Sequence, residues 1–106
     1  MSTTQDFIEY VCEQAAGTGD IRYKKMFGEY MLYVNNKPLL PVCDNTVYIK
    51  MLPELDELMS GAETGHPYNG AKLHYILDID DRELTHKAIA ILEPIIPVPK
   101  PRKKKV

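Results

Sequence analysis

Residues 23–51 contain three short runs of mostly apolar, strand-forming residues, and two pairs of polar turn-forming residues, Asn35-Asn36 and Asp44-Asn45, separate these runs. Asn and Asp tolerate positive φ better than most residues, so each pair suits the centre of a tight hairpin. The runs beside these pairs are rich in valine, leucine, isoleucine and tyrosine, which favour strands. Strands joined by such short loops must be antiparallel neighbours, because a parallel return needs a long crossover. The sequence therefore predicts a three-stranded antiparallel meander over residues 30–51.

Alternation along these strands predicts two unlike faces for the sheet. One face is mostly aliphatic and should meet the helices: Tyr30, Leu32, Val34, Val47, Ile49 and Met51. The other face carries Met31, Tyr33, Tyr48 and Lys50. Tyrosine side chains can lie half exposed with the hydroxyl in water, which makes this second face the candidate surface for a partner. Pro38 and Pro41 cannot donate ladder hydrogen bonds, so we expect the strand at residues 37–43 to be bulged or to lie partly at an edge.

Residues 21–27 precede the meander and are predicted to form a further strand. Arg22, Lys24 and Lys25 sit beside Tyr23 and could form a small basic patch. The alternative is a solvated strand face, whose lysines discourage pairing between sheet edges. Gly28 follows this strand and is expected to serve a bulge or a positive φ.

Helical spacing predicts three helices around this sheet. The first follows an apolar stripe that ends before Gly17: Phe7, Ile8, Val11, Cys12, Ala15 and Ala16. Ser2 or Thr3 can cap it, and Ser2 with Gln5 makes a capping-box pattern. The second begins at Pro53, and the third follows the capping-box-like pair Asp80 and Glu83. Pro94 limits the third helix to about Glu93.

The segment between the second and third helices holds a loop at residues 62–71 and a strand at residues 73–79. The resulting order is helix, four strands, helix, strand, helix. This order predicts an α+β fold of two layers, an antiparallel sheet of about five strands with the helices on one face. A chain of 106 residues forms one domain, which we expect to span residues 1–96, followed by a basic, proline- and lysine-rich flexible tail at residues 97–106.

The formal net charge of −2 hides an asymmetry between the tail and the rest of the chain. The tail holds five basic residues and no acid: Lys100, Arg102, Lys103, Lys104 and Lys105. The remaining chain holds 8 basic and 15 acidic residues, a net charge of −7. The tail can therefore attract any polyanion through charge alone, or it can simply keep an acidic domain soluble. It has no interleaved aromatic residues, so sequence-specific readout of bases is not expected.

The sequence lacks the signals of an enzyme, a metalloprotein or a membrane protein. His66, His74 and His86 fall on different predicted elements, without metal-ligand spacing, and are expected to be ordinary surface residues. Cys12 and Cys43 are far apart and are expected to pack as small hydrophobic side chains. No apolar run approaches a membrane span, and the first residues do not resemble a signal peptide, so the cytoplasm is the expected location. We expect no catalytic residue, cofactor or metal.

Several of these segments carry a family resemblance that covers residues 5–93. The segments are Met26-Phe27-Gly28, then Tyr30, Leu32-Tyr33, the asparagine turn and the run at residues 47–50. Together they resemble the N-terminal domain of the bacterial TfoX/Sxy family of competence regulators, here in a standalone form. Lys24-Lys25 stands where that family usually has an arginine. The resemblance implies a secretion-chaperone-like fold, a homodimer and a regulator of competence gene expression that acts through protein partners at transcription rather than by catalysis.

Three functional readings follow from these features. The leading one is a non-enzymatic binding module with candidate partner-binding residues in its strands: Arg22, Lys24, Lys25, Tyr33, Tyr48 and Lys50. The alternative is a nucleic-acid-associated protein that docks through its tail and the patch of Arg22, Lys24 and Lys25. A third reading is an enzyme that uses the loop at residues 62–71 as a lid, with His66 or His74 in a pocket beneath it.

Overall fold

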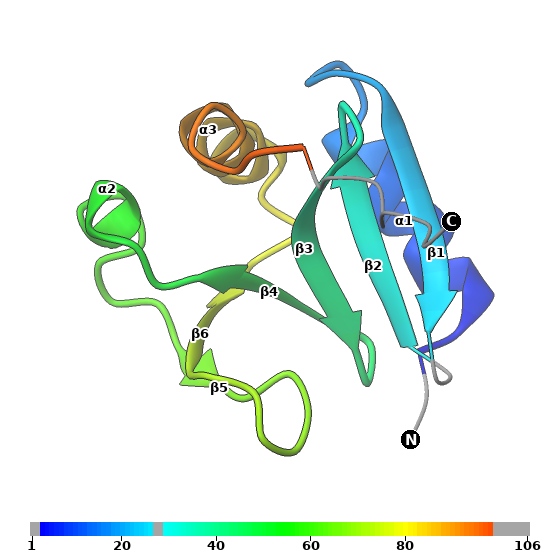
Figure 1. Cartoon of the computed structure of the whole chain (residues 1–106), viewed down its shortest axis with the longest axis horizontal. Coiled ribbons are helices and arrows are strands. Elements are labelled where there is room, and N and C mark those ends of the chain that lie inside the picture. The colour runs from blue at the N-terminus through cyan, green and yellow to red at the C-terminus, as the bar shows by residue number, and fades with distance from the viewer. Residues whose placement is uncertain (1–2, 27–28, 99–106) are drawn as a thin grey trace, which may run out of the picture.

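In a computed structural model, the described residues, 3–26 and 29–98, contain an antiparallel sheet of six strands in the order β1-β2-β3-β4-β6-β5 (Figure 1). The helices and strands follow one another along the chain as α1 Gln5–Ala15, β1 Ile21–Met26, β2 Glu29–Val34, β3 Lys37–Cys43, β4 Thr46–Lys50, α2 Pro53–Asp56, β5 Thr64–Gly65, β6 His74–Leu77 and α3 Arg82–Leu92. The predicted α+β fold is confirmed. The addition is β5, a two-residue strand inside the segment predicted as a loop.

Both predicted hairpin turns are present, with the backbone conformation that their residues favour. The φ angles are 54° at Asn35, 66° at Asn36, 52° at Asp44 and 53° at Asn45. Positive φ at two successive residues defines a turn whose twist matches that of the flanking strands. These turns place β1 to β4 as consecutive antiparallel neighbours. The meander predicted from the strand-forming runs and their turn pairs is thus confirmed.

The helices all cover one face of the sheet, and the core lies between the two layers. The helices contribute Ile8, Val11, Leu55, Ala88, Ile89 and Leu92 to one buried apolar cluster. Alternate strand residues complete it: Leu32, Val34, Leu40, Val42, Val47, Ile49 and Leu77. Lys37 ties β3 to the end of α3, because its Nζ lies 3.0 Å from Glu93 Oε2 and donates to the Glu93 carbonyl oxygen at 2.9 Å.

Strand β3 is irregular on both sides. Its pairing with β2 shifts register between Leu32 and Tyr33, and its pairing with β4 is limited to Val42 with Val47 and Cys43 with Thr46. The pairing with β4 ends next to Pro41, which has no N–H to donate. From there β4 diverges from β3 towards β6 (Figure 1). The expectation of a bulged strand that lies partly at an edge is confirmed.

Three local predictions are wrong, and two further predictions concern residues that the structure does not describe. The first helix is capped by Thr4, whose Oγ1 accepts from the Phe7 N–H at 3.2 Å, and not by Ser2 or Thr3. Asp81, not Asp80, caps α3 by accepting from the Leu84 N–H at 3.0 Å. Met51 does not lie on the buried face, because it follows the end of β4 and is 40% exposed. The predicted role of Gly28 and the tail beyond Val98 fall outside the described residues.

Candidate functional site

The sheet face that points away from the helices is the first candidate for a functional surface, and we call it the open face. Residues paired across antiparallel strands share a face. Arg22 pairs with Tyr33, Lys24 with Met31 and Lys50 with His74. None of these residues is buried, whereas their neighbours Leu32, Val34 and Ile49 are. Predicted partner-binding residues are therefore brought together on the open face: Arg22, Lys24, Tyr33, Tyr48 and Lys50.

Lys25 is the exception among the predicted site residues. It pairs with Tyr30, which is only 7% exposed and belongs to the core. Lys25 therefore projects from the helix-covered side of β1, opposite to Arg22 and Lys24. Consecutive strand residues point to opposite faces, so the predicted patch of three basic residues is wrong in its third member.

At the β1–β2 end of the open face, basic groups lie next to an aromatic ring. The Lys24 Nζ lies 5.5 Å from the centroid of the Tyr33 ring, within the range of a cation–π contact. Arg22 is exposed, and its Nε donates to Asp20 Oδ2 at 3.1 Å. These side chains border a shallow hollow of about 580 Å³ that Asn36 and Val98 also line.

At the β4–β6 end, Tyr48 packs edge-on against His74, with ring centroids 6.5 Å apart. Gly65 lies next to the Tyr48 ring, where a Cβ would be 3.4 Å from the ring atom Cε2, at van der Waals contact. Partial burial, together with negative charge nearby, raises the pKa of the Tyr48 hydroxyl above its usual value. Tyr48 therefore stays neutral and can donate a hydrogen bond to a partner.

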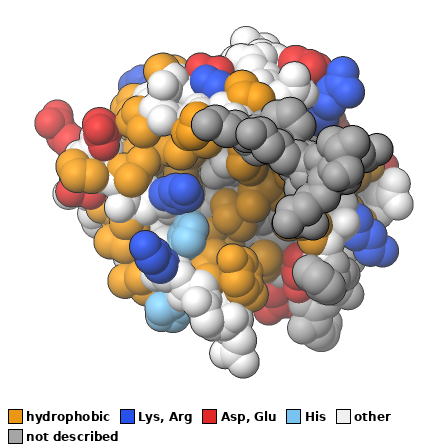
Figure 2. All heavy atoms as spheres, viewed as in Figure 1, with side chains coloured by type: hydrophobic (Ala, Val, Ile, Leu, Met, Phe, Trp, Pro, Cys, Tyr) orange, Lys and Arg blue, Asp and Glu red, His pale blue; other side chains and the backbone are white. Residues whose placement is uncertain are grey.

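An apolar pocket of about 530 Å³ separates these two ends of the open face. Its lining includes Met26, Met31, Pro41, Cys43 and Tyr68, with Glu29 at its border. Burial, with the charges of Glu29 and Asp44, raises the pKa of the Cys43 thiol to about 11. The thiol is therefore neutral at physiological pH and acts as an apolar surface. Figure 2 shows this side of the molecule, with basic and histidine side chains beside a hollow of apolar ones.

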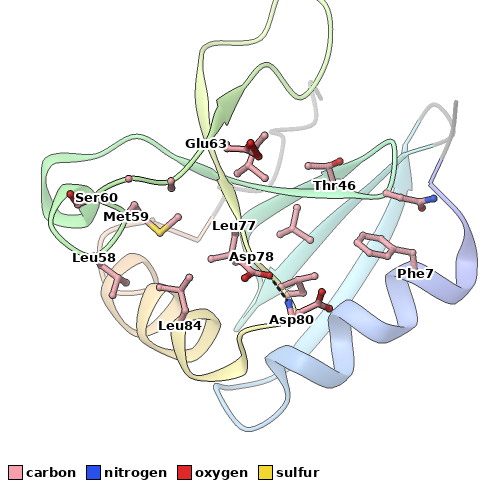
Figure 3. Close-up of a pocket in the computed structure, with 16 residues that line it drawn as sticks. Phe7, Thr46, Leu58, Met59, Ser60, Glu63, Leu77, Asp78, Asp80 and Leu84 are labelled. Atoms are coloured by element: carbon pink, nitrogen blue, oxygen red, sulfur yellow. Dashed lines mark hydrogen bonds between the residues drawn. The ribbon is translucent and has the colours of Figure 1, made fainter.

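A third hollow, of about 600 Å³, lies elsewhere in the molecule, and we call it the acidic cleft. Phe7 of α1 forms one wall, Leu58 and Met59 after α2 form the other, and Leu84 of α3 lies below (Figure 3). Its acidic residues are Glu63, Asp78 and Asp80, and no Lys, Arg or His is among its described lining residues. The backbone N–H of Asp80 donates to Asp78 Oδ1 at 3.2 Å, and the Tyr10 hydroxyl donates to Asp80 Oδ1.

The three histidines are separated and each makes a hydrogen bond with a carbonyl group. His66 Nδ1 lies 2.8 Å from the Ala71 oxygen, His74 Nδ1 lies 2.7 Å from the Lys72 oxygen, and His86 Nε2 lies 3.0 Å from the Gln14 oxygen. Within residues 3–26 and 29–98, no group of three or more His, Cys, Asp or Glu side chains could hold a metal ion. Over the same residues, no helix is long and apolar enough to cross a membrane.

Sequence reasoning found the open face but missed the apolar pocket and the acidic cleft. Alternation places Met31 and Tyr33 on the open face, yet nothing local in the sequence brings Tyr68 to Cys43. Likewise, Phe7 and Asp78 come from opposite ends of the chain, and only the folded structure brings them to one cleft. The one signal in the sequence was the pair Asp78 and Asp80 at the end of the last strand, which is too common a pattern to indicate a cleft.

Fold and surface together define a small α+β domain in which, among the described residues, the helices cover only one face of the sheet. No known family model matches the chain. It is 34% identical over 107 residues to the "uncharacterized 12.7 kDa protein in trpE 5'region" of Spirochaeta aurantia, an alignment that covers 99% of this chain and 93% of that protein. The chain belongs to the same family as this spirochaete protein.

Proposed function

We propose that this protein is a non-enzymatic binding module that acts through protein partners, and that it regulates gene expression in the cytoplasm. The observation that carries the proposal is the open face: within residues 3–26 and 29–98, the helices cover one side of the sheet and none covers the other. The regulatory role rests on the resemblance of the sequence to the N-terminal domain of the TfoX/Sxy competence regulators. That resemblance also supports a partner in the transcription machinery and a homodimer.

The chemistry of the open face fits a protein partner. Interfaces between proteins are enriched in tyrosine, methionine and arginine around an apolar centre, and they have a polar rim. The open face has this composition, because Met26, Met31 and Cys43 line the apolar pocket, and Tyr33 and Tyr48 lie on either side of it. An apolar side chain of the partner would fill the pocket, and the basic residues at both ends would favour acidic groups around it.

The proposal is tested by affinity capture from native lysate with two matched variants. Lys24→Glu with Lys50→Glu reverses two charges on the open face. Lys25→Glu with Lys87→Glu makes the same change on the helix-covered side, where both residues are exposed. We expect the first pair to lose the captured protein and the second to retain it. Equal capture by both pairs, or no partner together with measurable turnover of a substrate, would contradict the proposal.

The contact of Lys24 with the Tyr33 ring favours a second candidate, a nucleic-acid-associated protein. Aromatic rings on an open sheet face can stack with bases of a single strand, and adjacent basic groups hold its phosphates. Arg22 and Lys24 satisfy the second condition, and the basic tail would add charge. Replacing the five basic tail residues by glutamine separates the candidates. Protein capture should survive this change, whereas nucleic-acid binding that depends on the tail should be lost.

A further inference from the structure

We infer that the acidic cleft binds the basic C-terminal segment, residues 97–106, of a second copy of this chain. The cleft lies apart from the open face, so the inference does not depend on the proposed function. Its lining includes the apolar residues Val47, Leu77 and Ile79. Leu77 lies between the walls formed by Phe7 and Leu58 (Figure 3). Such a cleft can take aliphatic or proline side chains at its floor and basic groups at its border.

Charge complementarity identifies the occupant. The cleft presents Glu63, Asp78 and Asp80, and no basic residue is among its described lining. The segment 97–106 presents five basic residues, three prolines and two valines, and it has no acid. Opposite charges facing one another steer association and fix its register. The segment therefore supplies both kinds of group that the cleft accepts.

The backbone along the cleft suits an extended chain. β5 pairs only with His74 and Tyr75, and the last contact beyond it is the Ile76 N–H donating to the Glu63 oxygen at 2.8 Å. From there to Ile79, the chain lines the cleft and has no strand partner among the described residues. The Asp78 oxygen accepts from the Asp81 N–H at 3.0 Å and the Ile79 oxygen accepts from Gln14 Nε2 at 2.8 Å, so a segment bound here would be held chiefly by its side chains. The prolines of the segment restrict φ to values that favour an extended conformation. An extended segment can therefore follow this edge.

The geometry favours binding between two copies over binding within one. Val98 lies beside Asn36, at one end of β3, whereas the cleft includes Asn45, beyond the other end. The six residue steps from Lys37 to Cys43 span about 20 Å in an extended strand. The eight residues after Val98 reach at most about 28 Å when fully stretched. Within one chain, Lys100 could not reach the far end of β3, and only an almost fully stretched tail would bring Lys103 to Lys105 there, whereas the tail of a second copy meets no such restriction.

The test measures self-association of the full chain by sedimentation at low and high salt. Two variants interrupt the contact from opposite sides. A cleft variant carries Glu63→Gln and Asp78→Asn, and the amide introduced by the second change keeps an oxygen that can accept from the Asp80 N–H. A tail variant carries glutamine in place of Lys103, Lys104 and Lys105. We expect each change to weaken association by about tenfold at low salt.

A control with Glu9→Gln and Glu13→Gln removes the same number of acidic charges from α1, at two exposed residues outside the cleft. This control should associate like the unchanged chain. If the control weakened self-association as much as the cleft variant does, only the overall charge of the chain would matter. That result would overturn the inference.

Mixing the two variants provides the decisive measurement. The cleft variant has an intact tail and the tail variant has an intact cleft, so a mixed dimer restores one of its two contacts. The mixture should therefore associate more tightly than either variant alone, though less tightly than the unchanged chain. A synthetic peptide of residues 97–106 should dissociate the unchanged chain without any substitution. A chain that is monomeric at every concentration, a dimer that is insensitive to the tail variant, or a mixture that fails to associate would overturn the inference.

Discussion

The carboxylate of Glu29 joins three parts of the molecule that are distant in sequence. It accepts hydrogen bonds from the Thr3 hydroxyl at 2.7 Å, from the Thr3 N–H at 3.0 Å and from the Asp44 N–H at 3.0 Å. Partial burial acts to raise the pKa of Glu29, but these hydrogen bonds outweigh it and the pKa is lowered. One side chain thus fixes the start of α1 and the turn between β3 and β4 to the start of β2.

Replacing Glu29 by glutamine should lower the free energy of unfolding by about 1–2 kcal/mol at neutral pH, because a charged acceptor with three donors is lost. A lowered carboxyl pKa stabilises the fold above the unfolded value of about 4.3, and this stabilisation is lost as the pH falls through the lower folded value. The difference between the unchanged chain and Glu29→Gln should therefore shrink on acidification. Urea unfolding over a pH series measures it, and Glu54→Gln, at an exposed position, is the control. A difference that is independent of pH would contradict this account.

Cys43 should resist thiol reagents in the folded chain. Its side chain is buried, and its pKa is raised to about 11, so little of the reactive thiolate is present at neutral pH. Cys12 is half-buried, and burial also raises its pKa. Mass spectrometry after alkylation should show slow modification of both, slower at Cys43, and equal rates after unfolding in denaturant. Rapid alkylation of folded Cys43 would show that the apolar pocket is open to solvent at the thiol.

Among the elements, the two hairpin turns depend on residues that accept positive φ. Asn36 has a φ of 66°, a conformation that costs other L-residues about 1–2 kcal/mol. Asn36→Ala should therefore lower the free energy of unfolding by about 1 kcal/mol, and Asn36→Gly should leave it nearly unchanged. Asn69→Ala, in the exposed loop before β6, is the matched control. Urea denaturation distinguishes the three variants, and an equal loss in all of them would exclude a conformational cause.

These elements also show how much local sequence can predict. The turns and the two faces of β2 and β4 follow from residue chemistry and a period of two, so they were predictable. The caps were misplaced by one or two residues because tertiary contacts decide them: the Thr3 hydroxyl donates to Glu29 at 2.7 Å and lies 3.3 Å from the Val42 oxygen, which leaves Thr4 to cap α1. Strand β5 has only two residues, too few for a periodic pattern. The pocket and the cleft depend on contacts between distant segments, which local patterns do not contain.

On the scale of the whole molecule, charge is divided between an acidic folded part and a basic end. If the protein binds nucleic acid through its tail, this division of charge predicts how strongly the affinity depends on salt concentration. Binding that depends on the five tail charges should weaken with salt, and replacing these residues by glutamine should reduce the slope of log affinity against log salt by about 4. Fluorescence anisotropy with a labelled DNA duplex measures the slope. A slope that does not change would exclude the tail as the source of binding.

The narrow connection between β3 and β4 also has a consequence for the whole molecule. With only Val42–Val47 and Cys43–Thr46 paired, the sheet consists of two halves that meet along a short seam near the turn. Opening at this seam needs few backbone hydrogen bonds to break, and it would change the distance between the Tyr33 end and the Tyr48 end of the open face. A partner that contacts both ends would hold the two halves of the sheet in one arrangement. Binding would then reduce the motion of one half relative to the other.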